Sequence, residues 1–272
     1  MSPDLTQAIR KLLGVAHGLK LNAVLIGALV SELAAVEDEE LTPPRGTNDA
    51  DFALRIRDWA EFAKLKKRLV ETGFVADSKI EHRLRMGGAM VDVVPYGPEI
   101  SSKEGEIHWP VSERAMVVLG FQEACAQAVE SQVEPNLRVK RLTLPGFILL
   151  KIMAFLDRRA AGVLKYRDDA EDLLFWFQHY ASGKHEERRY EILTRGLSDI
   201  QYDSAGAALL GLEVAGLASP AAAARVRIFL GLAVDLYGPF VAAATSSSFE
   251  DRQKQAMQLA TAFKRGFEAV KG

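Results

Sequence analysis

The sequence predicts an α+β protein in which a mixed α/β half comes first and an all-helical half follows. Up to about residue 140, short apolar runs with the two-residue period of strands alternate with amphipathic helical segments. Beyond Pro145 the periodic segments have helical spacing, and the expected helices cover residues 145–157, 167–181, 186–197, 204–217, 220–236 and 248–270. We therefore expect two domains: residues 1–140, with a mixed sheet and flanking helices, and residues 141–272, with helices alone.

In the first half, each helix or strand is predicted from the spacing of its apolar residues and from the residues that end it. An amphipathic helix ends at Gly18, and Gly27 separates a buried strand from the next helix. Asp58 is the expected N-cap of a third helix, and Gly73 follows the end of that helix. The dipeptide Gly87-Gly88 suits the two-residue turn of a hairpin. The expected strands cover residues 22–26, 49–56, 79–86, 89–95, 115–121 and 136–144.

Composition and charge narrow the classes of function. The 272 residues are 49% hydrophobic and 26% charged, with a formal net charge of -2, which is typical of a globular protein and does not indicate a nucleic-acid or membrane partner. Cys125 is the only cysteine, so disulfide frameworks and multi-cysteine metal sites are excluded. No uncharged apolar run reaches the roughly 20 residues of a membrane span, and the first residues lack the pattern of a signal peptide. We expect a cytoplasmic location and no membrane partner.

Three aspartates lie in predicted strands, where aspartate is rare because its side chain resists burial. Asp49 and Asp51 are two residues apart, so a strand points both side chains to one face, and Asp92 lies inside the apolar segment VDVVP. If these strands are neighbours, the three carboxylates converge and repel one another, and a divalent cation relieves the repulsion. Mg²⁺ is the expected ion, with Mn²⁺ as the alternative, because it takes hard oxygen ligands and shares them with substrate phosphates.

The same residues also allow a purely structural interpretation. In it, Asp51 pairs with Arg45 or Arg55. Asp49 caps a loop, and Asp92 faces solvent on an edge strand. Spacing alone favours this interpretation, because isolated Asp-x-Asp pairs are common and weak as motifs.

The order of the segments changes that preference. A strand ending in Gly27, a helix, Asp-x-Asp on a strand and a lone Asp on a later strand together resemble the nucleotidyltransferase superfamily related to DNA polymerase beta. Further matching segments are LIGALVSEL, RGTNDADFAL, EHRLRM, VDVVPYG, IHWP, LGFQEA, LPGFILLKIMAFLDR and YRDDAEDL, over roughly residues 22–180. Together they resemble the bacterial predicted nucleotidyltransferases of the AbiEii toxin type. With this resemblance, the metal-site interpretation is favoured, on a nucleotidyltransferase-type mixed sheet.

The resemblance implies a role for each of the three aspartates. Asp49 and Asp51 would bind the metal pair and the nucleoside triphosphate. Asp92 would hold the second metal ion and help to deprotonate the acceptor hydroxyl. His82 and Arg83, on the hairpin that leads to Asp92, are expected on a solvated strand face rather than in contact with substrate.

The resemblance also implies a set of substrate contacts. They are Gly27, Ala28, Arg45, Thr47, Lys151 and Lys165. Glycine lets the backbone approach the phosphates, and the basic side chains suit phosphate oxygens. Ala28 departs from the family pattern, because relatives commonly have a second glycine at this position.

The segment Asp168–Asp172 is a second departure. Relatives often carry a lysine there, so Lys165 or Arg167 would have to replace it. Asp169 and Asp172 are interpreted as an acidic first helical turn that complements the helix dipole, with the orientation of basic groups as the alternative.

The activity that the resemblance implies is magnesium-dependent transfer of a nucleoside monophosphate from a nucleoside triphosphate to a hydroxyl of RNA or protein, with release of pyrophosphate. It also implies a component of a toxin-antitoxin system with a cognate toxin or antitoxin partner. The alternative is a catalytically inactive nucleotide-binding or partner-binding module of antitoxin type, which Ala28 and the missing lysine favour. Transfer by the purified protein separates the two.

Overall fold

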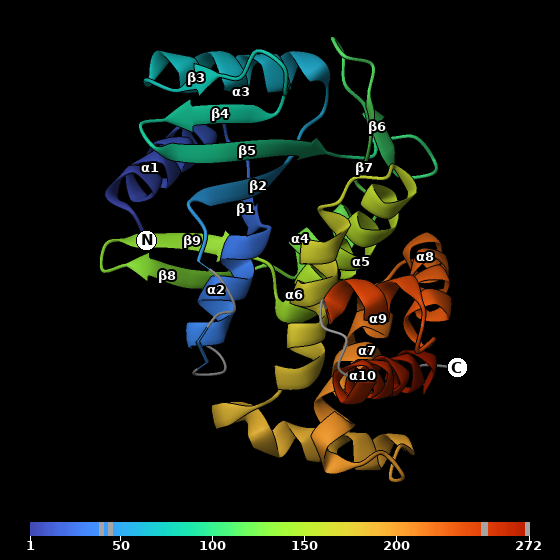
Figure 1. Ribbon diagram of the computed structural model, residues 1–272. Coiled ribbons are helices and arrows are strands. Elements are labelled where there is room, and N and C mark those ends of the chain that lie inside the picture. Colours follow the sequence, from blue (N-terminus) through green and yellow to red (C-terminus); the bar gives the residue numbers. More distant parts are fainter. Residues whose placement is uncertain (38–40, 43–45, 246–249, 270–272) are drawn as a thin grey trace. The chain divides into compact units, whose positions relative to one another are not determined.

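The computed structural model describes residues 1–37, 41–42, 46–245 and 250–269, and it divides into two compact units (Figure 1). Unit 1 comprises Met1–Leu33 and Arg45–Thr143, and unit 2 comprises Ala34–Pro44 and Leu144–Gly272. The predicted fold class is confirmed, because a mixed α/β sheet with helices precedes a largely helical region. The segment Ala34–Pro44, which the sequence places in the first domain, groups with unit 2.

Unit 1 is built on a mixed sheet. Its strands are β1 (Ala23–Ile26), β2 (Asp49–Arg55), β3 (Val75–Ala76), β4 (Arg83–Met86), β5 (Ala89–Tyr96), β8 (Val129–Glu134) and β9 (Leu137–Arg141). Within the described residues their order is β3-β4-β5-β2-β1-β9-β8. β2 is parallel to β5 and β1 to β9, and the other neighbours are antiparallel. A separate antiparallel pair joins β6 (Glu106–His108) and β7 (Ala115–Val117).

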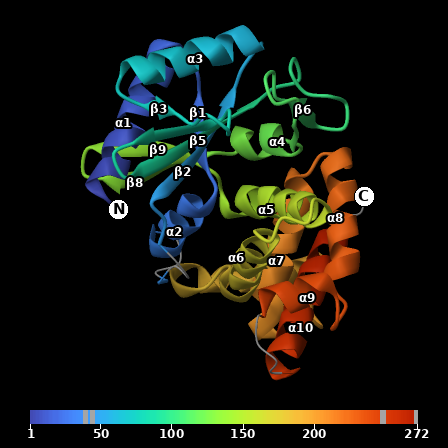
Figure 2. The same cartoon turned by 45° about the horizontal axis from the view of Figure 1, so that its top comes forward.

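Along the described chain up to Thr143, four helices alternate with these strands. They are α1 (Pro3–Gly18), α2 (Ala28–Glu37), α3 (Trp59–Glu71) and α4 (Phe121–Ala126). α1 contacts both α3 and β5, and Figure 2 shows α1 and α3 on the same side of the strands. Asp58 caps α3 as predicted, because its carboxylate accepts a hydrogen bond from the backbone N–H of Glu61 at 2.8 Å.

The predicted hairpin is present between β4 and β5. Met86 pairs with Ala89 across the two-glycine turn, in which Gly87 has a φ of +56°. The first strand of the hairpin is shorter than expected, since β4 begins only at Arg83. The preceding residues form a turn instead, because the carboxylate of Asp77 accepts hydrogen bonds from two of the next three backbone N–H groups.

Unit 2 consists of helices packed around aromatic side chains. Its elements are α5 (Leu144–Ala160), α6 (Tyr166–His179), the 3₁₀ stretch η1 (Gly183–Arg195), α7 (Tyr202–Leu217), α8 (Pro220–Ala233), α9 (Pro239–Ala244) and α10 (Glu250–Ala269). Trp176 is fully buried, and the rings of Phe155, Phe229 and Phe240 pack edge to face against one another. α7 and α10 approach closely, because a Cβ atom on Gly211 would lie 2.0 Å from the carbonyl oxygen of Phe263. In the described part of the chain, no helix combines the length and the apolar character needed to cross a bilayer.

Candidate functional site

Neighbouring strands of the sheet place polar residues in one row. Asp51 on β2 is the register partner of Asp92 on β5, and Asp92 is the partner of Arg83 on β4. Asp51 also lies opposite Ile26, the last residue of β1. Register partners project their side chains from the same face of a sheet, and so do residues two apart on one strand. The carboxylates of Asp51 and Asp92 therefore share a face, and Asp49 belongs to the same face.

Gly27 lies directly against this row. It follows β1 with a φ of +74°, and a Cβ atom at this position would lie 2.0 Å from Oδ2 of Asp51. Both the positive φ and this close approach favour glycine over any residue with a side chain. Ala28, which begins α2, is half-buried beside it. The turn from β1 into α2 thus brings backbone into contact with the second aspartate of the Asp-x-Asp pair.

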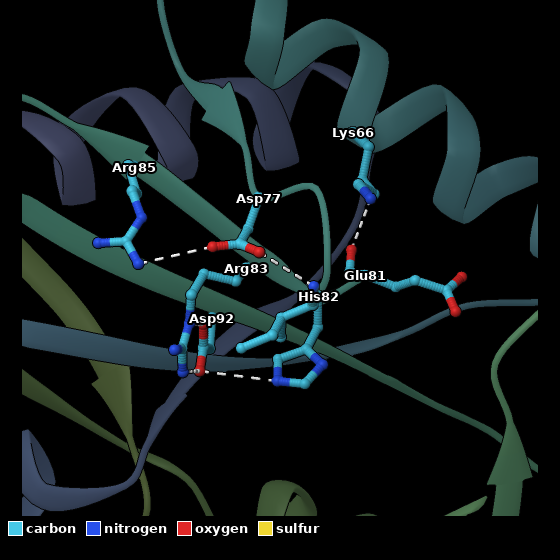
Figure 3. A network of polar contacts seen from close by, with 8 residues as sticks. Lys66, Asp77, Glu81, His82, Arg83, Arg85 and Asp92 are labelled. Carbon is cyan, nitrogen blue, oxygen red and sulfur yellow. Dashed lines mark hydrogen bonds and ion pairs between the residues drawn. The ribbon is translucent and has the colours of Figure 1, made fainter. Parts of the chain in front are cut away.

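The carboxylate of Asp92 is held by Arg83, as Figure 3 shows. Nε of Arg83 donates to Oδ1 of Asp92 at 2.8 Å, and Nη2 donates to Oδ2 at 2.7 Å. Such a two-pronged, charge-assisted contact is among the stronger polar interactions in proteins. The hydrogen bonds to Asp92 raise the pKa of Arg83, and the charges of Asp49 and Asp77 raise it further.

His82 completes this part of the site. Its Nε2 lies 3.7 Å from Oδ2 of Asp92, and its ring packs against Trp109 with the ring centroids 5.2 Å apart. Burial lowers the pKa of His82, and the negative charge of Asp92 offsets part of that effect. The expectation of a solvated strand face is wrong for both neighbours, since the side chains of His82 and Arg83 are only 18% and 20% exposed.

A signal for the Arg83 contact was present in the sequence. Counting outward from the two-residue turn at Gly87-Gly88 pairs Arg83 with Asp92, and the structure has this register. An arginine directly opposite a buried carboxylate is a cross-strand ion pair. The contact is not apparent when the alternation of polar and apolar residues is considered for each strand separately, because the contact depends on which residues of the two strands pair.

The three carboxylates do not gather around one point as the metal-site hypothesis expects. Within residues 1–37, 41–42, 46–245 and 250–269, no group of three His, Cys, Asp or Glu side chains is placed to hold a metal ion. Both oxygens of Asp92 accept hydrogen bonds from the guanidinium of Arg83 instead. The alternative with Asp92 on a solvent-facing edge is also wrong, because β5 lies between β4 and β2 and Asp92 is 9% exposed.

The chemistry of the donor set still suits a divalent cation. Asp49 and Asp51 offer hard carboxylate oxygens from one face of β2, and both are partly exposed. The carboxylate of Asp51 occupies the place that a Cβ atom on Gly27 would take. Asp92 lies on the same face. The carboxylate oxygens of Asp49 and Asp51 therefore suit Mg²⁺ or Mn²⁺, and the two side chains share one face of β2. The third proposed ligand, Asp92, is hydrogen-bonded to Arg83.

Thr47 orients the start of β2. The backbone N–H of Asp49 donates to Oγ1 of Thr47 at 3.1 Å, and the backbone N–H of Thr47 donates to Oε2 of Glu32 at 3.2 Å. The hydroxyl thus supports the first aspartate of the pair. Arg45 lies outside the described residues, so its contact with substrate and its pairing with Asp51 stay predictions.

Lys151 belongs to a buried cluster of charges in unit 2. Its Nζ lies 2.9 Å from Oδ1 of Asp169 and 2.7 Å from Oδ2 of Asp172, and Nη1 of Arg158 donates to both carboxylate oxygens of Asp169. Asp169 lies in the first turn of α6 as expected, but both aspartates are buried and pair with basic groups, which is the alternative interpretation. Lys165 precedes α6 and is exposed. The roles of Lys151 and Lys165 in triphosphate binding stay predictions.

These ion pairs also set the protonation of Lys151. Burial by itself lowers the pKa of its ammonium group, but the charges of Asp169 and Asp172 and their hydrogen bonds outweigh burial, so the pKa is raised. The ammonium therefore stays charged at neutral pH.

Comparisons with known proteins give low-identity structural matches. No protein-family model and no curated protein matches the sequence. The solution structure of the antibiotic-resistance factor ANT(2'')-Ia matches with a TM-score of 0.40 and 15% identity, over 64% of this chain and 86% of that chain. Its crystal structure with adenylyl-2''-tobramycin matches with a TM-score of 0.38 and 15% identity, over 71% and 97%. An antigenic nucleotidyltransferase-like protein from Paracoccidioides brasiliensis matches with a TM-score of 0.40 and 17% identity, over 63% and 74%.

Proposed function

We propose that the chain is a magnesium-dependent nucleotidyltransferase. It moves a nucleoside monophosphate from a nucleoside triphosphate to a hydroxyl group of RNA or protein and releases pyrophosphate. The finer assignment to AbiEii-type proteins and to a toxin-antitoxin system, with a cognate toxin or antitoxin, belongs to this proposal and rests on the sequence resemblance.

The observation that carries the proposal is the pairing of Asp51 with Asp92 on neighbouring parallel strands, beside Gly27. Aspartates on central strands resist burial unless something uses their charge. Here Asp49 and Asp51 share one face, and the backbone of Gly27 approaches Asp51 at a place where a side chain would clash with the carboxylate. Carboxylates next to a glycine turn at the start of a helix suit a triphosphate bound through divalent cations.

The proposed reaction is an in-line displacement. The acceptor oxygen forms a bond to the α-phosphorus, and the bond from that phosphorus to the oxygen of the departing pyrophosphate breaks. The proton of the acceptor hydroxyl passes to Asp92 or onward to water. Bound divalent cations supply neutralisation of the phosphate charge. The residues of the chain contribute by positioning the reactants and by charge, which are the main sources of catalysis in phosphoryl transfer.

A labelled-transfer assay tests the proposal. The full chain is incubated with Mg²⁺, each of the four labelled triphosphates and total cellular RNA or protein, and incorporation is followed on gels. We expect incorporation with at least one triphosphate and a loss of roughly 100-fold or more in Asp51→Asn, the scale of one preorganised electrostatic contact. Asp58→Asn is the matched control, because asparagine caps helices as well as aspartate does.

Two results would contradict the proposal. One is that no triphosphate labels either acceptor pool, although the protein is folded by circular dichroism. The other is that Asp51→Asn transfers label as fast as Asp58→Asn, since the carboxylate of Asp51 would then have no part in the reaction.

A second candidate is a module that binds a nucleotide or a partner without turnover. The contact between Arg83 and Asp92 favours it, because one of the three proposed ligands is already neutralised. Ala28 in place of a second glycine also favours it. Tight triphosphate binding by calorimetry without transfer to any acceptor would support this candidate.

A further inference from the structure

We propose that His82 binds the acceptor hydroxyl together with Asp92, and that Trp109 and Glu81 hold its imidazole ring in place. This inference rests on the proposed function, from which it takes the acceptor. The hydroxyl group is the chemistry that RNA and protein acceptors share, and the two sources are separate arms of the test. The inference makes His82 a residue that contacts the reacting oxygen.

The imidazole of His82 and the carboxylate of Asp92 are too far apart for a hydrogen bond, but close enough to share a partner (Figure 3). Nε2 of His82 lies 3.7 Å from Oδ2 of Asp92. An oxygen atom about 2.8 Å from each of them fits this span, since that is the usual length of hydrogen bonds to oxygen. Oδ2 accepts one hydrogen bond from Arg83 and keeps a lone pair for a second. A hydroxyl group can thus donate to Asp92 and accept from His82 at the same time.

The ring of His82 has hydrogen-bonding capacity to spare. The side chain is only 18% exposed, and among the described residues no hydrogen bond reaches either ring nitrogen. A neutral imidazole offers one N–H donor. A largely buried donor without a partner costs free energy, which a bound hydroxyl would recover.

The contribution of His82 to the reaction is orientation. With the proton on Nε2, the ring donates to one lone pair of the hydroxyl oxygen, while the hydroxyl proton points at Oδ2 of Asp92. That proton moves to Oδ2 as the oxygen bonds to the α-phosphorus and pyrophosphate leaves, and His82 keeps its own proton throughout. The lone pair that attacks is thereby aimed, which is the kind of positioning that lowers a transfer barrier.

Packing holds the ring of His82. The residue lies in the turn that precedes β4, where strand alternation does not direct its side chain. Its carbonyl oxygen accepts a hydrogen bond from the backbone N–H of Val93 at 2.8 Å, which places the backbone beside Asp92. The imidazole faces the indole of Trp109, with the ring centroids 5.2 Å apart and the planes tilted by 32°. Trp109 is itself 4% exposed and packs against two aromatic rings of α3.

Glu81 anchors the loop that carries Trp109. Its carboxylate accepts hydrogen bonds from the backbone N–H groups of Val111 and Ser112, at 3.3 and 2.8 Å, and from the hydroxyl of Ser112 at 2.7 Å. The loop is thereby tied to the residue directly before His82. Trp109 and Glu81 are positioning residues, because they reach the acceptor only through the imidazole.

Transfer kinetics test the contact with the acceptor. The full chain is assayed with the triphosphate and the acceptor pool that wild type labels, in wild-type, His82→Phe, His82→Gln and His108→Phe forms. His82→Phe keeps a ring for Trp109 but loses both nitrogens. We expect its kcat/KM for the acceptor to fall roughly 10-fold, the scale of one net hydrogen bond, with KM for the triphosphate unchanged. His82→Gln keeps an N–H donor and should lose less, and His108→Phe, at an exposed position of β6, should match wild type.

Chemical modification gives a second measure that needs no turnover and no substitution of His82. Diethyl pyrocarbonate modifies neutral imidazole nitrogens, and mass spectrometry follows all five histidines of the wild-type chain. The reaction is run without acceptor, with total cellular RNA and with total cellular protein. We expect the pool that contains the acceptor to slow modification of His82 and to leave the rate at His108 unchanged.

Glu81→Ala tests the positioning. Without its anchor the loop holds Trp109 less firmly, so His82 should react faster with diethyl pyrocarbonate, and kcat/KM for the acceptor should fall. Glu81→Gln is the matched variant, since its amide oxygen can still accept from the loop, and it should change both quantities less. Equal reactivity of His82 in wild type and Glu81→Ala would overturn the positioning role.

Failure of the inference and failure of the proposed function give different results. If an acceptor pool protects His82 but no form of the chain transfers nucleotide, the binding role of His82 stands and the proposed function falls. If the chain transfers nucleotide and His82→Phe does so with the wild-type kcat/KM, the inference falls and the function stands. Absence of both transfer and protection contradicts both.

Discussion

Gly27 shows how a single residue without a side chain sets the spacing of the candidate site. Its φ of +74° is costly for other residues, and its hydrogen faces Oδ2 of Asp51 at a distance that a methyl group cannot share. The turn from β1 into α2 can therefore approach Asp51 only with glycine in this place. A substitution of Gly27 should therefore change both the stability of the protein and the position of the Asp51 carboxylate.

We expect Gly27→Ala to lower the free energy of unfolding by more than about 1 kcal/mol, because a left-handed backbone costs a residue with a Cβ atom about 1–2 kcal/mol and the new methyl displaces Asp51. Urea denaturation followed by circular dichroism measures the change. Gly14→Ala is the control: this exposed position in α1 has open space around it, and alanine should stabilise the helix by roughly 0.5–1 kcal/mol. Equal stabilities of wild type and Gly27→Ala would contradict the prediction.

At the scale of the element, α5 and α6 are joined through buried charges as well as through apolar packing. Lys151 and Arg158 on α5 face Asp169 and Asp172 on α6. Removal of one member of such a group leaves a buried charge without its compensation, which destabilises a protein more than loss of an exposed pair does. The helix pair is therefore sensitive to changes that a surface helix would tolerate.

Lys151→Met should lower the free energy of unfolding by about 3–5 kcal/mol, the cost of breaking a buried pair. Because the pKa of Lys151 is raised in the folded chain, its contribution is complete below the ordinary lysine value of about 10.4 and is lost as the pH rises through the folded value. Urea denaturation at about pH 8 and about pH 11 should show the difference between wild type and Lys151→Met shrinking at the higher pH. Arg159→Met, at an exposed position of α5, should change stability by less than about 1 kcal/mol. A difference that grows with pH would contradict the assigned role of Lys151.

Several elements could be predicted from sequence because their signals are local. The turn at Gly87-Gly88, the cap at Asp58 and the strand that carries Asp49 and Asp51 depend on neighbouring residues alone, and the structure contains all three.

The short helix α9 is not among the helices predicted from the sequence, because its six residues are too few to display a helical period.

What could not be predicted depends on partners from other elements. The burial of Asp169 follows from Lys151 and Arg158, which a distant helix supplies, and spacing within one helix does not reveal them. The contact of Asp92 with Arg83 likewise requires the pairing of two strands. The sequence pattern singles out the aspartates as unusual, whereas the basic residues that pair with them are known only from the folded structure.

At the scale of the whole molecule, the two units carry separate optical reporters. Trp59 and Trp109 lie in unit 1, and Trp176 lies in unit 2. Trp109 packs against His82, which borders the candidate site. A Trp176→Phe variant therefore follows the unfolding of unit 1 by fluorescence.

With the Mg²⁺–triphosphate complex as a single ligand at about 100 times its dissociation constant, the proposed site should stabilise unit 1 by about 2.7 kcal/mol. The measurement is urea unfolding of Trp176→Phe with and without ligands, followed by tryptophan emission. Asp51→Asn in the same background is the control and should lose most of this gain. A gain of equal size in the control would place the ligands away from Asp51.

The assignment of Ala34–Pro44 to the helical unit has a consequence for biosynthesis. This stretch leaves the ribosome before residues 45–143, yet the rest of the unit to which it belongs begins only at Leu144. Domains usually fold in order as they emerge, but here an early piece must wait for the late one. The strands of unit 1 can therefore assemble during translation while residues 34–37, at the end of α2, still lack the rest of the unit with which they group.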